Sequence, residues 1–467
     1  MNYYDANLDK NAANYVPLTP LSFLERAKDV YPNYEAIVYE DRKYTWAQVY
    51  KRALKFASAL EKIGIKKGDT VSFLAFNTPE IFEAHYSVPM TGAVLNTINI
   101  RLDANTISYI LNHSDAKVLV VDRQLHIEVK KALSKLDKKI TVIDIHDKFA
   151  DQSKLEKIGD LEYEKFLNTG DDNYAWKMPE DEWQAISLSY TSGTTGNPKG
   201  AMISHRAFIS RAMYCVYEYN IDKDDVFPAW APMFHMASTD LAIGSVIIGG
   251  SIAFVDGFKS EQIIKLIKTY KLSWLVLMPG MIEELLGKLK KKKLSIKGIK
   301  VMGAMADLVP KKQIKEITYL LKTPYLNSFG STETGMPPAS AGLIPINKQR
   351  FGLSKIQSSF CQVKLENEKG MVAKIGEVGE CLIKGPTLFS GYWNAKETNK
   401  HDFRGGWFHM GDLMKRNDNG TLDFVDRSKY LIKSGGENIY PAEIERVLLG
   451  SKNVLERIKS NKQIGLL

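Results

Sequence analysis

The chain has 467 residues, of which 44% are hydrophobic and 25% are charged. This length suits about three domain-sized units with large buried cores, and the composition excludes a disordered or fibrous protein. The net charge of +9 comes mainly from lysines spread along the chain, and the one dense run at 288–293 indicates a solvated helix end rather than nucleic-acid binding.

The first predicted elements alternate between helices and strands. Apolar residues recur on one face of a helix that opens at Thr45 and ends at Gly64. The segments 71–76, 117–122 and 140–145 are short apolar runs separated by helical stretches, which predicts buried strands. This βα alternation is typical of a parallel sheet.

The second half of the chain repeats this pattern and then changes. Ser260 is predicted to cap a helix, and 273–278 is predicted to be another buried strand. From about residue 355 the segments are short and alternating, and Asn419-Gly420 predicts a hairpin. We therefore expect an α/β protein with two α/β sheet subdomains, a β-rich subdomain and a small α+β C-terminal lobe.

The cysteines and the apolar segments predict where the protein resides. Cys215, Cys361 and Cys381 form no short-spaced pair, and an odd number argues against a disulfide framework. The N-terminus lacks a basic start followed by an apolar stretch, so no secretory signal is expected. The longest uncharged apolar stretch, residues 241–255, is too short to span a bilayer. These features predict a soluble, cytoplasmic protein without a transmembrane segment.

A loop rich in glycine and hydroxyl side chains follows an apolar strand in the middle of the chain. The eleven residues from Tyr190 to Gly200, both included, contain five hydroxyl side chains, three glycines and one lysine, Lys199. The backbone N–H groups and hydroxyls of such a loop can turn toward phosphate oxygens, with Lys199 as a mobile cation. The Walker pattern Gly-Lys-Ser/Thr is absent. From this loop alone, a phosphate site and a flexible surface loop are equal alternatives.

Three further segments follow in order: Asn327-Ser-Phe-Gly-Ser-Thr-Glu-Thr-Gly335, Gly405-Gly-Trp-Phe-His-Met-Gly-Asp412, and a stretch from Asp426 to Glu445 that contains Ser-Gly-Gly-Glu-Asn. Together with the loop before Gly200 they resemble the signature segments of the adenylate-forming superfamily, which includes acyl-CoA synthetases, luciferases and the adenylation domains of peptide synthetases. The resemblance covers nearly the whole chain. Four motifs in family order over about 255 residues make coincidence negligible.

The resemblance implies a role for each motif residue. Phe329 would stack on adenine, Thr332 would bond the α-phosphate, Glu333 would hold Mg²⁺ and Asp412 would accept the ribose hydroxyls. An aromatic face suits a flat base, and a hard carboxylate suits a hard cation. Taken singly, each residue also has a plain structural alternative, such as core packing, a turn cap or a surface ion pair. The remaining residues that the resemblance assigns to nucleotide or substrate binding are Thr191, Ser192, Gly193, Thr194, Thr195, Gly196, Lys199, Gly303, Arg427 and Lys433.

The acid substrate is suggested by the segment Pro232-Met-Phe-His-Met-Ala-Ser238. It resembles the family segment beside the reacting carboxylate, so His235 is expected to position the acid rather than serve a purely structural role. Amino-acid-activating relatives place an aspartate about here, which makes amino-acid activation a minor alternative. The neighbouring apolar residues, which include Leu241 and Ile243, fit a fatty or aromatic acid.

The implied reaction uses ATP, Mg²⁺ and CoA to convert a carboxylic acid into an acyl-adenylate and then an acyl-CoA. Residues 1–427 are predicted to form the AMP-binding domain. Residues 428–467 would form a hinge at Lys429 and an incomplete C-terminal lobe, because only 38 residues follow Lys429. Family members carry a second lysine near their C-terminus, and no such segment is present, so reduced turnover is expected. A catalytically depleted nucleotide- or acyl-binding remnant is the alternative. The sequence leaves the oligomeric state open, and a homodimer is one of the alternatives.

Overall fold

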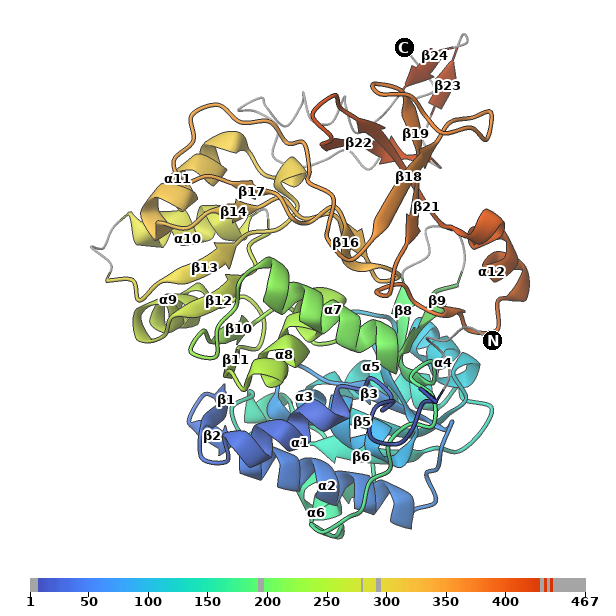
Figure 1. The fold of residues 1–467 in the computed structure, drawn as a ribbon. Helices are drawn as coiled ribbons and strands as arrows, with labels where there is room; N and C mark the ends of the chain where they lie inside the picture. Colours follow the sequence, from blue (N-terminus) through green and yellow to red (C-terminus); the bar gives the residue numbers. More distant parts are fainter. Residues whose placement is uncertain are drawn as a thin grey trace.

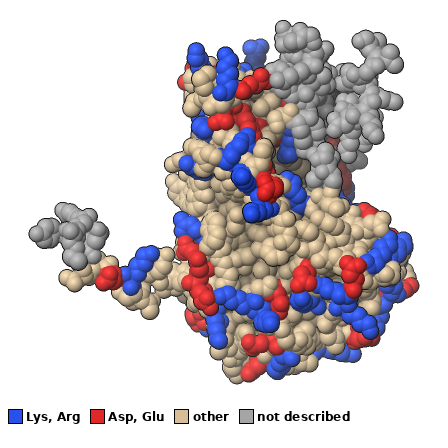
Figure 2. Space-filling view, turned by 90° about the vertical axis from the view of Figure 1, so that its right-hand side faces the viewer, with Lys and Arg blue, Asp and Glu red and all other residues tan. Residues whose placement is uncertain are grey.

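The computed structural model describes residues 7–191, 197–278, 280–290 and 295–428, together with the backbone of two short strands at 432–434 and 437–439. Figure 1 shows two large sheets with helices between and around them, and a separate twisted sheet formed by the last described part of the chain. The N-terminal segment up to residue 16 is exposed and stands away from the body (Figure 2). The predicted α/β class is confirmed.

The larger sheet contains the strands predicted in the first half of the chain. β3 pairs in parallel with β4 and β5 at the centre of the sheet, and every residue of β3 is buried. The β8–β9 and β9–β20 pairs are antiparallel. In spatial order the strands are β20 (Gly391–Tyr392), β9 (Lys199–Ser204), β8 (Ala185–Thr191), β4 (Val94–Thr97), β3 (Thr70–Leu74), β5 (Ala116–Asp122), β6 (Thr141–Ile145) and β7 (Leu161–Glu162).

The second layer consists of two short sheets that join end to end. A parallel bridge between Val226 and Leu272 continues one sheet into the other. The strands in order are β2 (Arg42–Thr45), β1 (Glu35–Tyr39), β11 (Ile252–Phe254) and β10 (Phe227–Ala229), and then β12 (Leu272–Leu275), β13 (Ile299–Met302), β14 (Tyr325–Leu326) and β17 (Leu343–Ile344). The parallel β1–β11–β10 and β12–β13–β14 pairs place the carboxyl ends of their strands at one edge.

The β-rich subdomain is an antiparallel sheet of β18 (Gln362–Glu366), β19 (Val378–Lys384), β21 (Phe408–Arg416) and β22 (Leu422–Arg427). The predicted hairpin at Asn419-Gly420 joins β21 to β22, and Gly420 has the positive φ of +83° that favours glycine in this turn. Two small ribbons accompany this sheet: β15 (Gly330–Ser331) with β16 (Gly335–Pro338), and β23 (Ile432–Ser434) with β24 (Glu437–Ile439).

The helices cover the sheets and fill the space between them. The first long helix follows the sequence prediction, because Thr45 and Gln48 form a capping box at its start. The helices are α1 (Leu21–Val30), α2 (Trp46–Lys62), α3 (Pro79–Ser87), α4 (Ala104–His113), α5 (His126–Leu133), α6 (Tyr163–Leu167), α7 (His205–Glu218), α8 (Met236–Ile248), α9 (Ser260–Thr269), α10 (Met281–Leu289), α11 (Lys311–Leu321) and α12 (Lys396–Asp402).

The helix pair α7 and α8 lies between the two large sheets (Figure 1). A β-carbon at Gly244 of α8 would lie only 3.1 Å from the carbonyl oxygen of Ala212 in α7, so glycine permits this close approach. The main hydrophobic core runs through both sheets and this helix pair, from Leu21 to Phe408. The residues placed between the sheets are therefore held by the largest core of the molecule.

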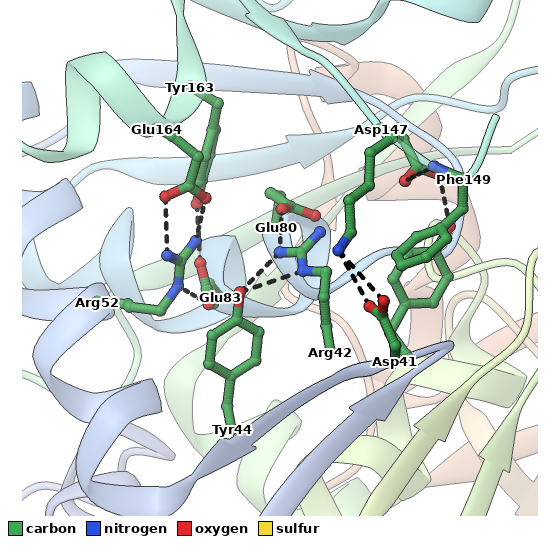
Figure 3. A network of polar contacts seen from close by, with 12 residues as sticks. Asp41, Arg42, Tyr44, Arg52, Glu80, Glu83, Asp147, Phe149, Tyr163 and Glu164 are labelled. Carbon is green, nitrogen blue, oxygen red and sulfur yellow. Dashed lines mark hydrogen bonds and ion pairs between the residues drawn. The ribbon is translucent and has the colours of Figure 1, made fainter. Parts of the chain in front are cut away.

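A buried network of charged side chains ties α3 to its neighbours (Figure 3). Arg52 pairs with Glu83 at 2.5 Å and with Glu164 at 2.6 Å, while Arg42 pairs with Glu80 at 2.5 Å. Burial raises the pKa of Glu83, and the Arg52 charge opposes that shift. Because each buried carboxylate has a guanidinium partner, the network tolerates charge in the interior and links α2, α3, α6 and β2.

One of the predicted helix caps was wrong. Helix α9 does begin at Ser260, but Lys259 occupies the cap position, and the Ser260 hydroxyl donates to Glu284 instead of capping the helix. A hydroxyl next to a helix start can bond to any acceptor that the tertiary structure brings near, and the sequence does not show that acceptor.

The domain boundary at residue 427 stays a prediction.

The surface charges and the described helices bear on whether the chain could contact or cross a membrane. On the face shown in Figure 2, basic and acidic side chains are interspersed, and the broad zone between the upper and lower parts carries few charges. No helix in the described ranges combines the length and the low charge that crossing a bilayer requires.

All three cysteines are free thiols, and Cys215 and Cys381 are buried.

Candidate active site

The loop predicted to bind phosphate is bounded by a strand pair that brings its first and last residues together. Thr191 at the end of β8 lies opposite Lys199 at the start of β9, and the Thr191 hydroxyl donates to the Lys199 carbonyl at 3.4 Å. The Lys199 ammonium nitrogen lies 4.3 Å from the centroid of the Tyr392 ring. An ammonium over an aromatic face is attracted by the ring electrons, so Tyr392 orients Lys199.

Tyr392 also contacts the predicted metal ligand. Its hydroxyl donates to Oε1 of Glu333 at 2.7 Å. Burial raises the pKa of Tyr392, and the Glu333 charge raises it further, so the phenol stays protonated and keeps its donor role. Tyr392 reaches this place because β20 pairs with β9, and the Phe389 N–H donates to the Glu333 carbonyl at 2.8 Å. The structure thus brings Lys199 over the ring of one tyrosine and Glu333 to its hydroxyl.

The segment that carries Thr332 and Glu333 is a tight turn between β15 and β16. The hydroxyl of the buried Thr334 accepts from the Ser331 N–H at 3.0 Å and donates to the Pro337 carbonyl at 2.6 Å. The carbonyls of Thr332 and Glu333 accept hydrogen bonds from Arg211 on α7 at 3.0 and 2.9 Å. The backbone of this turn is therefore fixed from both sides.

Phe329, predicted to stack on adenine, connects this turn to the β-rich subdomain. Its half-buried ring packs against Phe424 of β22, with the centroids 5.3 Å apart. On another side, the buried Lys355 lies 6.0 Å from the Phe329 centroid, donates to Asn327 at 2.7 Å and pairs with Asp307. These contacts set the position of the ring, and its role toward a base stays a prediction.

Asp412 and Arg427 face each other across β21 and β22. The Arg427 Nε atom lies 3.0 Å from Oδ1 of Asp412, and the Arg427 side chain is 46% exposed whereas that of Asp412 is 3% exposed. Phe424, on the same hairpin, packs on Phe329. The hairpin therefore places a buried carboxylate and a more exposed guanidinium beside the segment that carries Phe329 to Glu333.

Gly303, at the carboxyl end of β13, lies close to the same segment. A β-carbon at Gly303 would lie 2.3 Å from the Tyr325 ring, and its φ of +86° also favours glycine. Two residues later, the N–H of Met305 donates to the Ser328 hydroxyl at 3.0 Å, and Met305 has a left-handed φ of +43°. Strained backbone of this kind persists where the surroundings enforce it.

His235 caps α8. Its Nδ1 atom accepts from the Ala237 N–H at 3.1 Å, and the surrounding protein lowers the pKa of its imidazole. With Nδ1 as the acceptor, the neutral ring carries its proton on Nε2. His235 is solvent-accessible and so can offer that N–H to a carboxylate oxygen. By contrast, Leu241 and Ile243, predicted to line an acid site, are completely buried in the core.

Some predicted residues lie outside the described part of the chain. They are the loop residues Ser192, Gly193, Thr194, Thr195 and Gly196, the hinge residue Lys429 and the side chain of Lys433. Their roles stay predictions.

Within the described residues, no group of three or more histidine, cysteine or acidic side chains is arranged to hold a metal ion. Glu333 contributes a single carboxylate there. Mg²⁺ commonly binds through one or two carboxylates together with substrate phosphates. The single carboxylate of Glu333 therefore fits Mg²⁺ that is bound together with the phosphates of a nucleotide.

A cavity of about 290 Å³ opens beside the segment that precedes His235. It is mainly apolar, with Phe76, Ile100, Trp230 and Phe234 among its lining residues. Two charged residues, Arg101 and Asp256, also line it. Burial raises the pKa of Asp256. The cavity could hold the hydrocarbon part of a small organic substrate.

Sequence reasoning missed Tyr392, Arg211 and Lys355, each of which contacts a predicted site residue. For Arg211 and Lys355 a signal existed, because each is a single charge in a run of mostly uncharged residues. Such a charge is normally paired when it is buried. Their partners could not be identified from the sequence, because Arg211 and Thr332 are 121 positions apart.

Comparison with known proteins shows the family. The model of the AMP-binding enzyme family matches residues 24–393. Acetate–CoA ligase from Humulus lupulus is 34% identical over 472 residues, which cover 96% of this chain and 83% of that protein. The peroxisomal trans-cinnamate:CoA ligase from Petunia hybrida is also 34% identical, over 482 residues, with the same shares covered.

Solved structures show the same fold. O-succinylbenzoate CoA synthetase from Bacillus subtilis in complex with AMP is 26% identical, with a TM-score of 0.77 over 93% of this chain and 84% of that chain. An anthranilate CoA ligase in complex with anthranoyl-AMP has a TM-score of 0.81 at 22% identity, over 95% of this chain and 84% of that one. The chain therefore belongs to the AMP-binding enzyme family and is an AMP-forming acid–thiol ligase of the acyl-CoA synthetase type.

Proposed function

We propose that this protein activates a fatty or aromatic carboxylic acid with ATP·Mg²⁺ and transfers the acyl group to CoA. The observation that carries the proposal is the contact chain from Lys199 through Tyr392 to Glu333. It joins a cation suited to phosphate and a carboxylate suited to Mg²⁺. The pair of Asp412 and Arg427 lies on the adjoining hairpin, where it is available to a ribose and a phosphate.

Each described residue has a task in this proposal. Lys199 pairs with phosphate oxygens, and the Thr332 hydroxyl bonds the α-phosphate. The carboxylate of Glu333 holds Mg²⁺. Mg²⁺ bound there would neutralise charge on the phosphates. Phe329 stacks on the base, Asp412 accepts from the ribose hydroxyls, and His235 donates its Nε2 proton in a hydrogen bond to the acid. Positioning and charge neutralisation supply most of the rate.

The reaction proceeds in two steps. In the first, a carboxylate oxygen of the acid attacks the α-phosphorus of ATP, the bond to the bridging oxygen breaks, and pyrophosphate leaves with its electron pair. In the second, the CoA thiolate sulfur attacks the acyl carbon and AMP leaves. The thiol proton passes to solvent or to the departing phosphate. No protein nucleophile is required, so Lys199 and Arg427 act through charge alone.

The acid class is proposed from the apolar surroundings and from the relatives. Proteins at 31–34% identity are named as ligases of acetate, butyrate, cinnamate, 2-methylpropanoate and benzoate. We assign the cavity lined by Phe76 and Phe234 to an organic substrate. The variant Phe234→Ala is expected to raise a single KM, and the KM that changes, for the acid or for CoA, identifies the occupant. Unchanged values for both would remove the cavity from the proposal.

The decisive experiment is mass detection of acyl-AMP and acyl-CoA after incubation of the whole chain with ATP, Mg²⁺, CoA and a panel of these acids. The variant Lys199→Ala should lose at least about tenfold in the rate of pyrophosphate release, as expected for removal of a preorganised charge. The matched control is Lys384→Ala, because Lys384 lies over the ring of Trp407 at 4.5 Å in the β-rich sheet. It should keep the wild-type rate.

Two outcomes would contradict the proposal. Equal rates for Lys199→Ala, Lys384→Ala and wild type would show that the lysine at the phosphate loop takes no part in the chemistry. Binding of ATP without either product, across the whole panel of acids, would favour a nucleotide- or acyl-binding remnant.

We also propose a cytoplasmic location, although several relatives are named as peroxisomal.

A further inference from the structure

Arg211 is a buried arginine that touches three backbone carbonyls of the candidate site. Its side chain comes from α7, and the residue is 2% exposed. Nη1 donates to the Thr332 carbonyl at 3.0 Å, Nη2 to the Glu333 carbonyl at 2.9 Å and Nε to the Thr387 carbonyl at 2.7 Å. The planar fork of the guanidinium thus fixes the spacing between two segments that are distant in sequence.

The turn fits closely around this side chain. A β-carbon at Gly335 would lie 2.9 Å from Cγ of Arg211 and 3.0 Å from its Cδ, so the backbone approaches the arginine stem as closely as glycine allows. Gly335 also has a φ of +74°. The carbonyl of Glu333 accepts from both Arg211 and the Phe389 N–H. The turn, the segment 387–389 that leads into the strand of Tyr392, and α7 therefore meet at one guanidinium.

The positive charge of Arg211 is compensated by the carboxylate of Asp240 on α8, without a direct ion pair. Its three hydrogen bonds to described residues all end on backbone carbonyls and not on carboxylates. The carboxylate of Asp240, on the facing helix α8, is 2% exposed, and its Oδ2 has no hydrogen-bond partner in the described part of the chain. Burial lowers the pKa of Arg211 and raises that of Asp240 to about 7, and each charge opposes the shift of the other.

An isolated buried charge is costly, so two opposite charges on facing helices are expected to depend on each other. Other titratable groups near Arg211 are Glu333 and Cys215, and burial keeps the thiol of Cys215 protonated by raising its pKa well above the usual value. Asp240 is thus the buried acidic group on α8 whose negative charge favours the charged guanidinium.

We propose that Arg211 is a positioning residue for acid activation: its guanidinium holds the carbonyls of Thr332 and Glu333 so that their side chains face the substrate, and Asp240 supplies the countercharge. This inference rests on the proposed roles of Thr332 and Glu333. Arg211 touches neither nucleotide nor acid in this scheme. It acts by preorganising a turn whose hydroxyl and carboxylate must be placed to within a fraction of an ångström.

The competing explanation is that Arg211 only stabilises the fold. The variant Arg211→Lys separates the two explanations, because lysine keeps the charge but cannot bridge three carbonyls with one planar group. Arg52 offers a matched control, since it is also a mostly buried arginine on a helix but pairs with Glu83 and Glu164 in the network of Figure 3. The control variant is Arg52→Lys.

The experiment measures kcat, the KM for ATP, the half-saturating Mg²⁺ concentration and the thermal midpoint for wild type, Arg211→Lys, Asp240→Asn and Arg52→Lys. We expect Arg211→Lys to lower kcat by about 10- to 100-fold and to raise the Mg²⁺ requirement, with a small change in KM. Asp240→Asn should lower kcat severalfold in the same manner. Arg52→Lys should lower the thermal midpoint and leave kcat unchanged.

Wild-type kcat and Mg²⁺ requirement in Arg211→Lys would overturn the proposal. If Arg211→Lys does not fold, the near-isosteric Asp240→Asn decides: wild-type values in that variant overturn the countercharge role. A calorimetric titration with ATP·Mg²⁺ and no acid separates this inference from the proposed function. In titrations at several Mg²⁺ concentrations, a higher Mg²⁺ requirement for ATP binding in Arg211→Lys than in wild type supports the positioning role even if no acid is turned over, and an equal requirement contradicts it.

Discussion

The pairing of Asp412 with Arg427 is the feature of the site whose geometry is defined most sharply at the level of single residues. The carboxylate is almost fully enclosed, and the guanidinium contacts one of its oxygens at 3.0 Å. An enclosed carboxylate that accepts from a ribose contributes through charge-assisted hydrogen bonds, each worth about 1.5–3 kcal/mol. The variant Asp412→Asn is therefore expected to raise the KM for ATP by about tenfold or more.

The same hairpin provides the control for this prediction. Lys415 and Asp423 also face each other across β21 and β22, with 3.8 Å between Nζ and Oδ2 and both side chains more than 30% exposed. An exposed pair contributes little, so Asp423→Asn should leave the KM for ATP within about twofold of wild type. Steady-state kinetics with varied ATP measures both. An equal rise in the two variants would indicate general damage to the sheet and not a lost ribose contact.

Among the elements, helices α2 and α7 show what the sequence can and cannot predict. Helix α2 could be predicted because its apolar period, its capping box and its stop signal are local features. The contacts of Arg211 depend on partners from other elements and could not be predicted. Likewise, the motif segments could be found in the sequence, but the contact of Tyr392 with both Lys199 and Glu333 depends on the pairing of β20 with β9.

The close packing of α7 on α8 leads to a prediction for Gly244. A β-carbon there would lie 3.1 Å from both the Ala212 carbonyl and Cγ2 of Val216, so Gly244→Ala should force the helices apart and destabilise the fold by about 1–3 kcal/mol. The control is Gly287→Ala in α10, where no atom lies within 4 Å of the added methyl group. That variant should stabilise the protein by about 0.5–1 kcal/mol through helix propensity.

Chemical unfolding of both glycine variants measures these effects. Opposite signs are the expected result. Destabilisation of similar size in both would show that the methyl group at Gly244 meets no special resistance, and that α7 and α8 adapt to it.

Helix α3 provides a prediction about pH. All nine of its residues are buried, including His85, whose two ring nitrogens have no hydrogen-bond partner in the described part of the chain. Burial lowers the pKa of His85 to about 3. Between pH 6.5 and pH 3 the unfolded state then binds more protons than the folded state, so stability present above pH 6.5 is lost as the pH falls.

The size of the effect follows from linkage. For a group that shifts from about 6.5 to about 3, roughly 3 kcal/mol of unfolding free energy is lost between pH 7 and pH 4. The variant His85→Phe should remove most of this dependence, whatever its effect on stability at pH 7. Urea unfolding of both proteins at several pH values gives the two slopes. Parallel curves would contradict the assignment of His85 as a buried neutral base.

At the scale of the whole molecule, the described chain is organised around one main core. The largest hydrophobic cluster extends from Leu21 to Phe408, through both large sheets and the helices between them. A smaller cluster joins the β-rich sheet to Phe329 and Ala339. Because Lys355 is buried between these parts and exchanges backbone hydrogen bonds with Leu422, the sheet that carries Asp412 is fastened to the rest.

This arrangement predicts the behaviour of a fragment that contains residues 1–427. The described residues assigned to the nucleotide lie before residue 428, and β22, which ends at Arg427, is paired along its length with β21. The fragment should therefore unfold in one cooperative transition, with a midpoint within a few degrees of that of the full chain, and should bind ATP with the same affinity. Acyl-CoA formation should fall by more than about tenfold, because the fragment lacks Lys433, which by resemblance to the family would line the thioester-forming site. Calorimetry, ATP titration and product detection measure the three quantities. Loss of ATP binding would show that part of the nucleotide site lies beyond residue 427, and two separate transitions would show that the β-rich sheet folds as a unit of its own.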